Sequence, residues 1–324
     1  MGEMVFGSNT ILPQTWFVLA KSNQLKRGGV KRVQLLNQKI SLFRTFSGNL
    51  VALKSRCPHL GADLSLGRVD GEAIICPFHN WKFDSSGHCM NANESSIDVK
   101  GIKTFSYPIL ENMGLIWVFN GPEPLFDPPE FCLDKSNSSK TLTVHGRIVK
   151  THYNLLISNG LDITHWKYVH GMEFIKPPEI ENVSEYHIRA RFHFLIKPIN
   201  IWNRIVCTLY GNRLFLDYNV YGGSVCLVKG IINNKSIDVL FSSSPLENGK
   251  SIARVSFIFK NLGFFQKTFK LYYFKFIKRF IMLKSVLHND IKILSSIDYH
   301  PGFTHKDEGL IKVVKQVNNL PKHL

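Results

Sequence analysis

Two cysteines and two histidines at close spacing constrain the fold of this chain more than any other feature. Cys57-x-His59 is followed, after sixteen intervening residues, by Cys76-x-x-His79. Each segment offers one thiolate and one imidazole, and prolines stiffen both segments. Four such ligands can share one metal centre only if two loops meet, so the pattern predicts a domain of β-hairpins whose tips hold a metal.

Two metal centres fit these four ligands. One is a tetrahedral zinc ion, and the other is a [2Fe–2S] cluster in which two histidines replace two cysteines on one iron. One cysteine and one histidine in each loop favours the cluster, because both cysteines can then bind one iron and both histidines the other. Such a cluster transfers single electrons at a potential of about −150 to +300 mV and performs no substrate chemistry by itself.

Short β-rich segments and turn residues fill the first 120 residues. Glycine-containing turns separate these segments, and proline-rich breaks at 121–124 and 127–129 end the pattern. We therefore expect an all-β domain over residues 1–125 and a linker over residues 126–140. The predicted strands are Trp16–Ala20, Arg32–Leu36, Ile40–Arg44, Leu50–Lys54, Ala73–Cys76, Trp81–Phe83 and Leu115–Phe119.

The pattern changes from about residue 141. A strand at Leu142–Val149 and a helix at Tyr153–Val169 precede a meander of strands, and a helix over about 264–297 closes the domain. Strands backed by late helices predict an α+β domain over residues 141–324. The predicted meander consists of Ile188–Ile196, Ile205–Tyr210, Leu214–Val220, Val225–Ile232, Ile237–Phe241 and Ile252–Phe259.

A second group of candidate ligands lies in the predicted helix, in the sequence Asp162-x-x-His165-x-x-x-x-His170. Side chains five residues apart stand about 140° apart on an ideal helix, since each residue turns it by about 100°. His165 and His170 can therefore reach one metal only if the helix ends or distorts between them. A carboxylate added to two histidines makes the facial triad of non-haem Fe(II) sites, so a third ligand is expected.

Asp290 is the best candidate for that carboxylate. It falls within an apolar stripe at helical spacing, where a carboxylate is costly unless it is paired or bound to metal. A salt bridge to Lys284, or a hydrogen-bonded core aspartate, would explain it as well. Asp298 and Asp217 are weaker candidates. The stripe consists of Leu283, Val286, Leu287, Ile293, Leu294 and Ile297.

Two residues near His165 are candidate catalytic residues. Asp162 lies one helical turn before His165 and can be a metal ligand, a residue that orients an imidazole, or a bridge to another site. Asn159 lies on the same face and is expected to line the metal pocket.

The chain is basic, with 40 Lys and Arg against 24 Asp and Glu, which gives a net charge of +16. This excess indicates either an acidic partner or a generally basic surface. Residues 264–281 alternate aromatic and basic side chains at three- and four-residue steps. They are interpreted as a core helix with lysines on its outer side, in preference to a membrane-surface helix or a docking face for an acidic ferredoxin. No nucleic-acid-binding motif accompanies them.

The cysteine content and the apolar segments bear on location. Six cysteines are too few for a disulfide-stabilised secreted scaffold, and no run reaches the roughly 18 apolar residues of a membrane span. Trp16–Ala20 is too short for the core of a signal peptide. We expect a cytoplasmic protein.

Together, these residues resemble the oxygenase (alpha) component of a Rieske non-haem iron oxygenase. Cys57-Pro58-His59 and Cys76-Pro77-Phe78-His79 match the family's cluster motif, and the Asp162, His165 and His170 spacing matches its iron motif. Asn80 stands where glycine is usual. The compact size is most similar to the α-only branch, which includes demethylases and hydroxylases. The downstream pattern continues at Trp81, Phe83, Asp84 and Gly87.

The resemblance implies two cofactors and a trimeric assembly. A Rieske domain would hold a [2Fe–2S] cluster through Cys57, His59, Cys76 and His79. A helix-grip (START/Bet v1-like) catalytic domain would hold mononuclear Fe(II) through His165, His170 and a late aspartate. In the family, the cluster of one subunit serves the iron of its neighbour in a homotrimer, and an aspartate matching Asp162 bridges the two sites.

The implied function is that of a terminal oxygenase. It would use O₂ to hydroxylate, dealkylate or dihydroxylate a hydrophobic organic substrate, in a pocket lined by the strands between about 188 and 259 and by the helix before Asp290. Electrons would come from a separate reductase or ferredoxin, and from NAD(P)H only indirectly, because the chain has no nucleotide-binding glycine motif. The alternative is a non-enzymatic electron carrier that has lost the iron site.

Overall fold

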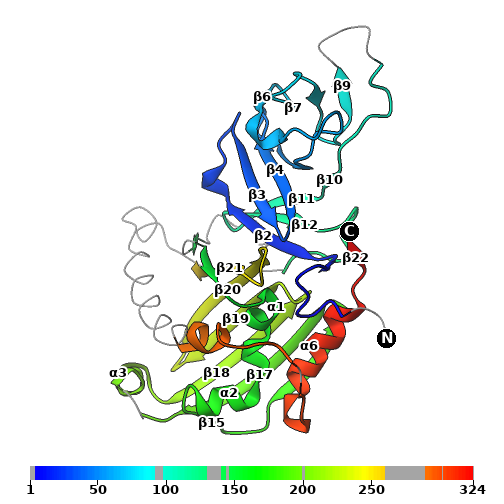
Figure 1. The fold of residues 1–324 in the computed structure, drawn as a ribbon. Helices are drawn as coiled ribbons and strands as arrows, with labels where there is room; N and C mark the ends of the chain where they lie inside the picture. The colour runs from blue at the N-terminus through cyan, green and yellow to red at the C-terminus, as the bar shows by residue number, and fades with distance from the viewer. Residues whose placement is uncertain are drawn as a thin grey trace, which may run out of the picture. The chain divides into compact units, whose positions relative to one another are not determined.

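The chain forms two compact units in the computed structural model, which describes residues 4–91, 98–129, 140–143, 146–198, 201–259, 289–300 and 302–323. The N-terminal unit consists of residues 14–125 with the last two residues of the chain. The C-terminal unit consists of residues 126–322 together with the first thirteen positions. Figure 1 shows the elements of each unit.

The N-terminal unit consists of three antiparallel sheets, in the orders β10-β5-β4-β3, β11-β12-β2 and β6-β7-β8-β9. The loop between β5 and β6 carries Cys57 and His59, and the loop between β7 and β8 carries Cys76 and His79. Every strand predicted in this region is present. The elements are β2 Trp16–Lys21, η1 Ser22–Gln24, β3 Val30–Leu35, β4 Gln38–Arg44, β5 Leu50–Lys54, η2 Leu64–Leu66, β6 Arg68–Asp70, β7 Ala73–Ile75, β8 Lys82–Phe83, β9 Cys89–Asn91, β10 Ser106–Tyr107, β11 Ile109–Asn112 and β12 Leu115–Phe119.

The C-terminal unit is a nine-stranded antiparallel sheet with helices α1, α2 and α6 on one face (Figure 1). Its main path runs β13-β21-β20-β19-β18-β17-β15, while β14 pairs with β21 and β16 pairs with β17. The elements are β1 Leu12–Pro13, β13 Lys140–Thr143, β14 Arg147–Val149, α1 Tyr153–Ser158, η4 Asn159–Leu161, α2 Ile163–Tyr168, β15 Met172–Phe174, β16 Glu179–Ser184, β17 His187–Ile196, α3 Ile201–Tyr210, β18 Arg213–Tyr221, β19 Val225–Ile232, β20 Lys235–Pro245, β21 Ser251–Phe259, η5 His305–Asp307, α6 Glu308–Asn319 and β22 Lys322–His323.

The main core of this unit lies between the sheet and its helices. Alternate residues of β17, including Phe192 and Phe194, point inward and are fully buried, as expected for a strand with one buried face. They pack with Trp166 of α2 and with Val313 and Val317 of α6. The predicted α+β class is confirmed.

Three predictions for this unit need correction. The segment 205–210, predicted as a strand, belongs to helix α3. Its β-branched residues suggested a strand, whereas apolar positions such as Ile201 and Ile205 recur at the four-residue spacing of an amphipathic helix. The predicted helix Tyr153–Val169 is divided into α1, η4 and α2. Helix α6 follows the helix that was expected to close the domain and was not predicted.

Of the predicted late helix, only residues 289–297 are described. Residues 289–294 are helical, and Asp290 lies among them. The basic aromatic segment 264–281 lies outside the described residues. No helix within the described ranges is long and apolar enough to cross a membrane.

The first residues of the chain are held within the C-terminal unit by polar contacts that are mostly partly buried. The backbone N–H groups of Val5 and Phe6 both donate to Asn318 Oδ1. His152 Nε2 lies 2.8 Å from the Ser8 carbonyl oxygen, and its Nδ1 accepts a hydrogen bond from the Asn154 N–H. This pairing suits a neutral imidazole, since a proton on Nδ1 would face another N–H.

Burial lowers the pKa of His152 to about 4, although the hydrogen bond to Ser8 opposes the shift. In the unfolded chain His152 therefore binds a proton near pH 6.5, whereas in the folded chain it binds one only near pH 4. The contribution of neutral His152 to the free energy of unfolding is fully present above about pH 6.5. It falls by about 3 kcal/mol as the pH falls towards 4.

We predict that His152→Gln reduces this loss of unfolding free energy between pH 6.5 and 4.5, because glutamine does not titrate. Urea denaturation at stepped pH values measures the effect. His300→Gln is the matched control, since the His300 side chain is 85% exposed. Parallel curves for His152→Gln and the native chain would contradict the assignment.

Candidate functional site

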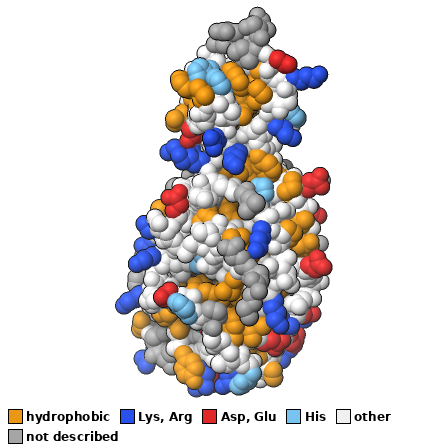
Figure 2. Space-filling model, turned by 45° about the vertical axis from the view of Figure 1, so that its right-hand side comes forward, with side chains coloured by type: hydrophobic (Ala, Val, Ile, Leu, Met, Phe, Trp, Pro, Cys, Tyr) orange, Lys and Arg blue, Asp and Glu red, His pale blue; other side chains and the backbone are white. Residues whose placement is uncertain are grey.

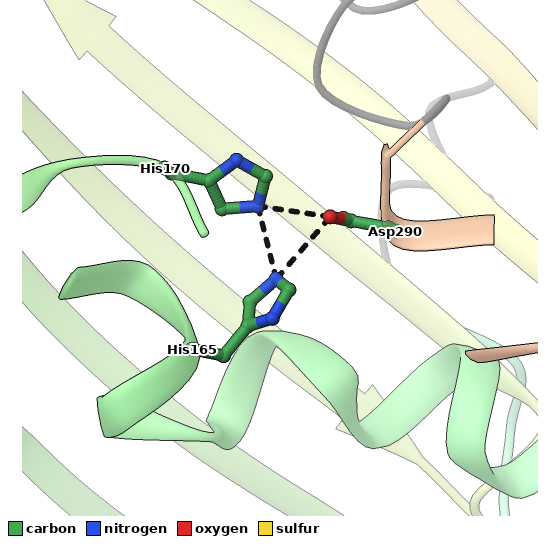
Figure 3. A group of neighbouring side chains, drawn as sticks. All are labelled: His165, His170 and Asp290. Atoms are coloured by element: carbon green, nitrogen blue, oxygen red, sulfur yellow. Dashed lines mark hydrogen bonds and ion pairs between the residues drawn. The ribbon is translucent and has the colours of Figure 1, made fainter. Parts of the chain in front are cut away.

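Helix α2 ends between the two candidate histidines, as their spacing required. His165 lies within α2, whose last residue is Tyr168, and the Val169 N–H donates to the His165 carbonyl oxygen at the C-cap. Gly171 then adopts a positive φ of 63°, which reverses the chain directly after His170. The His170 imidazole points towards the His165 imidazole just beyond the end of α2 (Figure 3).

Three ligand atoms meet at this point (Figure 3). The His165 and His170 Nε2 atoms are 2.9 Å apart. Asp290 Oδ1 lies 3.4 Å from His165 Nε2 and 3.1 Å from His170 Nε2. All three side chains are buried. Within the described residues, no other set of three histidine, cysteine or acidic side chains has its ligand atoms within 4.8 Å of one another.

The geometry suits a single metal ion. Adjacent ligands of a six-coordinate metal at bond lengths of about 2.1 Å lie about 3 Å apart, close to the three distances observed. Asp290 Oδ1 is buried and makes no hydrogen bond of good geometry, although both imidazoles are near. Two histidines and one carboxylate on one side of an ion leave its remaining positions open for other ligands.

Electrostatics keeps Asp290 ready to bind a cation. Burial raises the pKa of its carboxyl group, but the interactions with His165 and His170 outweigh burial and hold the pKa below its ordinary value. The carboxylate is therefore ionised at neutral pH. The weaker candidates lie elsewhere: Asp217 forms an ion pair with Arg189, and the Asp298 side chain is 95% exposed.

Asn159 and Gly160 shape the second side of the site. Asn159 Nδ2 lies 3.1 Å from His165 Nε2 and 3.5 Å from Asp290 Oδ2. Gly160 packs against the Tyr218 ring so closely that a Cβ would lie 2.2 Å from it. The Tyr218 hydroxyl donates to the Ile157 carbonyl oxygen. Sequence reasoning missed this Gly160–Tyr218 contact, because the two residues are far apart in the chain.

A cavity of about 220 Å³ adjoins two of the three ligand residues and includes His165, Asn159 and Asp290 in its wall. The rest of its described wall is mainly apolar and comes largely from the strands of the sheet. A wall of this kind excludes water and accepts an apolar molecule. The apolar side chains are Leu156, Trp166, Met172, Ile196, Val206, Leu214, Leu216, Val228, Ile232, Ile237, Val239 and Phe241.

Asp162 caps the N-terminus of α2. Its Oδ1 accepts hydrogen bonds from the backbone N–H groups of Thr164 and His165, at 2.9 and 3.0 Å, and from the Thr164 hydroxyl. Such a cap stabilises a helix by about 1 kcal/mol. No hydrogen bond to Oδ2 is present among the described residues. Asp162 therefore fixes the backbone of His165 while one of its oxygens stays available.

The two cysteines of the N-terminal unit lie side by side in its core. Burial raises the pKa of the Cys57 thiol to about 11; a backbone hydrogen bond from His59 opposes this, and the hydrogen-bonded Cys76 thiol adds to it. The His59 and His79 ring centroids are 4.6 Å apart. Backbone hydrogen bonds close both loops, from Gly61 N to the Cys57 oxygen and from Cys76 N to the Trp81 oxygen.

This arrangement fits a cluster better than a single ion. Four ligands around one zinc ion would lie within about 4 Å of one another. Cys57, His59, Cys76 and His79 include no three ligand atoms within 4.8 Å of one another. A pair of thiols next to a separate pair of imidazoles is what a two-iron centre requires. These four residues could therefore hold a [2Fe–2S] cluster.

The rim of this second site is exposed and partly apolar. Leu60 and Phe78, next to the two histidines, are 66% and 61% exposed. Figure 2 shows histidine and hydrophobic side chains gathered at this end of the N-terminal unit. Asn80, at the position where glycine was expected, adopts a left-handed φ of 55°. Asparagine tolerates that conformation, so the loop keeps its turn.

Comparison with known proteins identifies the domain that carries the four cysteine and histidine ligands. Residues 15–106 match the family model of the Rieske [2Fe–2S] domain. The chain is 34% identical over 173 residues to the cholesterol 7-desaturase of Bombyx mori, covering 50% of this chain and 36% of that protein. It is 32% identical over 171 residues to the 4β-methylsterol monooxygenase of Methylococcus capsulatus, covering 50% and 46%.

A third relative matches a longer part of the chain. The oxygenase component of the 3-ketosteroid-9-alpha-monooxygenase of Rhodococcus rhodochrous is 26% identical over 226 residues, covering 68% of this chain and 58% of that protein. The matched segments thus span between about a third and somewhat over half of the length of these curated relatives.

Solved structures extend the fold comparison over nearly the whole chain. Dicamba monooxygenase bound to dicamba aligns with a TM-score of 0.72 at 20% identity, covering 94% of this chain and 96% of that one. NdmA of Pseudomonas putida with caffeine aligns with a TM-score of 0.68 at 17% identity, covering 93% and 88%. The fold is therefore shared over more than nine tenths of the chain.

Residues 15–106 therefore belong to the Rieske [2Fe–2S] domain family. The chain as a whole shares its fold with dicamba monooxygenase and NdmA, and the curated proteins that it resembles are named as a desaturase and monooxygenases.

We predict that Gly160→Ala lowers the unfolding free energy by about 1–3 kcal/mol, because its methyl group would overlap the Tyr218 ring. Gly302→Ala is the control, since a Cβ there meets nothing within 4 Å. Urea denaturation measures both variants. Equal stability of Gly160→Ala and the native chain would contradict the close contact.

Proposed function

We propose that this chain is the terminal oxygenase of a multicomponent system, which uses O₂ and externally supplied electrons to oxidise a hydrophobic organic molecule. The observation that supports this most strongly is the convergence of His165, His170 and Asp290 within 3.4 Å at an apolar cavity. A chain that only carried electrons would have no use for a second metal site beside a cavity.

Each site is assigned one cofactor under this proposal. Cys57 and Cys76 would hold one iron of the cluster, and His59 and His79 the other. The facial triad of His165, His170 and Asp290 would hold Fe(II). When bound, the two centres supply single-electron transfer and O₂ activation, respectively.

The chain's own residues prepare the second site for that chemistry. Asp290 stays ionised and compensates the charge of a cation, while the C-terminal turn of α2 fixes both imidazoles. Asn159 donates towards the site from the cavity wall. The apolar wall excludes water and holds a substrate by its hydrophobic surface.

The substrate is proposed to be hydrophobic, and its reaction a hydroxylation, dealkylation or dihydroxylation. The apolar wall supports this, and the relatives' names agree with it, since two refer to sterols and one to a ketosteroid. Electrons are proposed to come from a separate reductase or ferredoxin.

The assembly and location are proposed on the same basis. A homotrimer, in which the cluster of one copy serves the iron of the next, is the assembly that the family resemblance implies. Residues 1–125 are assigned to the Rieske domain, 126–140 to the linker and 141–324 to the catalytic domain. A cytoplasmic location fits the five free cysteines among the described residues.

We predict that His165→Ala lowers the rate of substrate turnover by at least about 100-fold while the visible absorption of the cluster is unchanged. The variant loses one of three ligands of the second site and none of the first. The assay combines cluster spectra with product analysis by mass spectrometry, using a surrogate reductase and a panel of aromatic, sterol-like and alkaloid compounds. Loss of both signals together would show that the two sites are not separable.

A pair of variants separates the two roles of Asp162. Asp162→Asn keeps an oxygen that can cap α2, whereas Asp162→Ala removes the cap. We predict that both variants slow electron transfer from the reduced cluster to the second site, measured by stopped-flow absorption in single turnover. Only Asp162→Ala should also lower stability, by about 1 kcal/mol. Normal electron transfer in Asp162→Asn would contradict the proposal that Asp162 links the cluster to the second site.

A further inference from the structure

A groove of about 450 Å³ lies at the base of the loop that carries Cys57 and His59. Three of its side chains, Lys39, Lys54 and Arg56, are exposed cations. The groove lies entirely within the N-terminal unit and is separate from the cavity beside His165. Its lining residues are Asn37, Gln38, Lys39, Lys54, Ser55, Arg56, Gly61 and Asp63.

The positive charge of this groove is not compensated within the described part of the chain. Asp63 is the one carboxylate in its wall, and it already accepts hydrogen bonds from Arg32 Nη1, at 3.3 Å, and from the Ser65 N–H. Those donors hold the pKa of Asp63 below its ordinary value, although burial opposes them. None of the three cations forms an ion pair with a described carboxylate, so the groove attracts an anionic surface.

The groove is also next to the point at which an electron can reach the cluster site. Arg56 directly precedes Cys57, and the Gly61 N–H donates to the Cys57 carbonyl oxygen at 2.9 Å. His59 lies in the same loop and is exposed. A protein bound in the groove would therefore lie beside an exposed ligand of the cluster.

We propose that this groove is the docking surface for an acidic electron-transfer protein that reduces the cluster. The inference rests on the proposed function, in which a separate protein supplies the electrons. Charge complementarity between a basic groove and an acidic partner accelerates encounter and fixes orientation, which is what brief and repeated electron transfer needs. A nucleic acid would also bind cations, but it would gain nothing from the exposed cluster ligand beside them.

The test reverses the three charges in the variant K39E/K54E/R56E. The probe is a reduced, acidic plant-type [2Fe–2S] ferredoxin, whose potential of about −400 mV makes electron transfer to a Rieske cluster favourable. Stopped-flow absorption follows reduction of the cluster. We expect the second-order rate constant to fall by at least about 10-fold at low ionic strength, and the native and variant rates to converge at about 1 M salt, where charges are screened beyond about 3 Å.

Two controls make the result specific. The variant K26E/K100E/K103E changes the net charge equally, at exposed positions of the same unit that do not line the groove, and should keep most of the native rate. Reduction by the methyl viologen radical cation should not slow in K39E/K54E/R56E, and its unchanged cluster spectrum shows that the variant is folded.

Three outcomes would overturn the proposal: equal slowing in both triple variants, a native rate that does not depend on ionic strength, or binding to DNA or anionic vesicles that the reversal removes while the ferredoxin rate stays unchanged. Absence of any cluster in the native protein would refute the proposed function instead. The two failures are therefore distinguishable.

Discussion

A buried carboxylate held against two buried imidazoles is the interaction on which the catalytic unit depends. A lone carboxylate in an apolar cavity would be strongly destabilising, and the sheet offers it no cationic side chain among the described residues that line the cavity. His165 and His170 offset this cost, and a metal ion would offset it further. The break in the helix after Tyr168 follows from this requirement, because a continuous helix would point the two imidazoles apart.

The positions of the ligand side chains at this site are fixed by local features of the backbone. The Asp162 cap fixes where α2 begins, and Gly171 fixes how the chain turns after it ends. Gly160 lets the Tyr218 ring approach the η4 turn, which places Asn159 beside His165. In the N-terminal unit, short backbone hydrogen bonds likewise set the two ligand loops.

The three candidate ligands of the second site could be predicted from the sequence because each departs from the pattern expected around it. Asp290 interrupts an apolar stripe, and His165 and His170 share a helix at a spacing that a straight helix cannot use. The strands were predictable from β-rich segments between turn residues, and in β17 the alternation of polar and apolar residues around Phe192 and Phe194 matches the alternating burial. What could not be predicted depends on contacts between distant segments. Examples are the Gly160–Tyr218 contact, the anchoring of Val5 by Asn318 and the choice of helix over strand in α3, where β-branched residues suit both.

The central claim is that His165, His170 and Asp290 hold one iron, apart from a two-iron cluster. Mössbauer spectroscopy of protein enriched in ⁵⁷Fe and reduced without oxygen tests this directly, because it counts irons by their electronic state. The account predicts two irons of a reduced Rieske pair for every lone high-spin ferrous ion, and loss of the lone ferrous signal alone in Asp290→Ala. A spectrum that contains the pair without the lone ferrous ion in the native protein would contradict it.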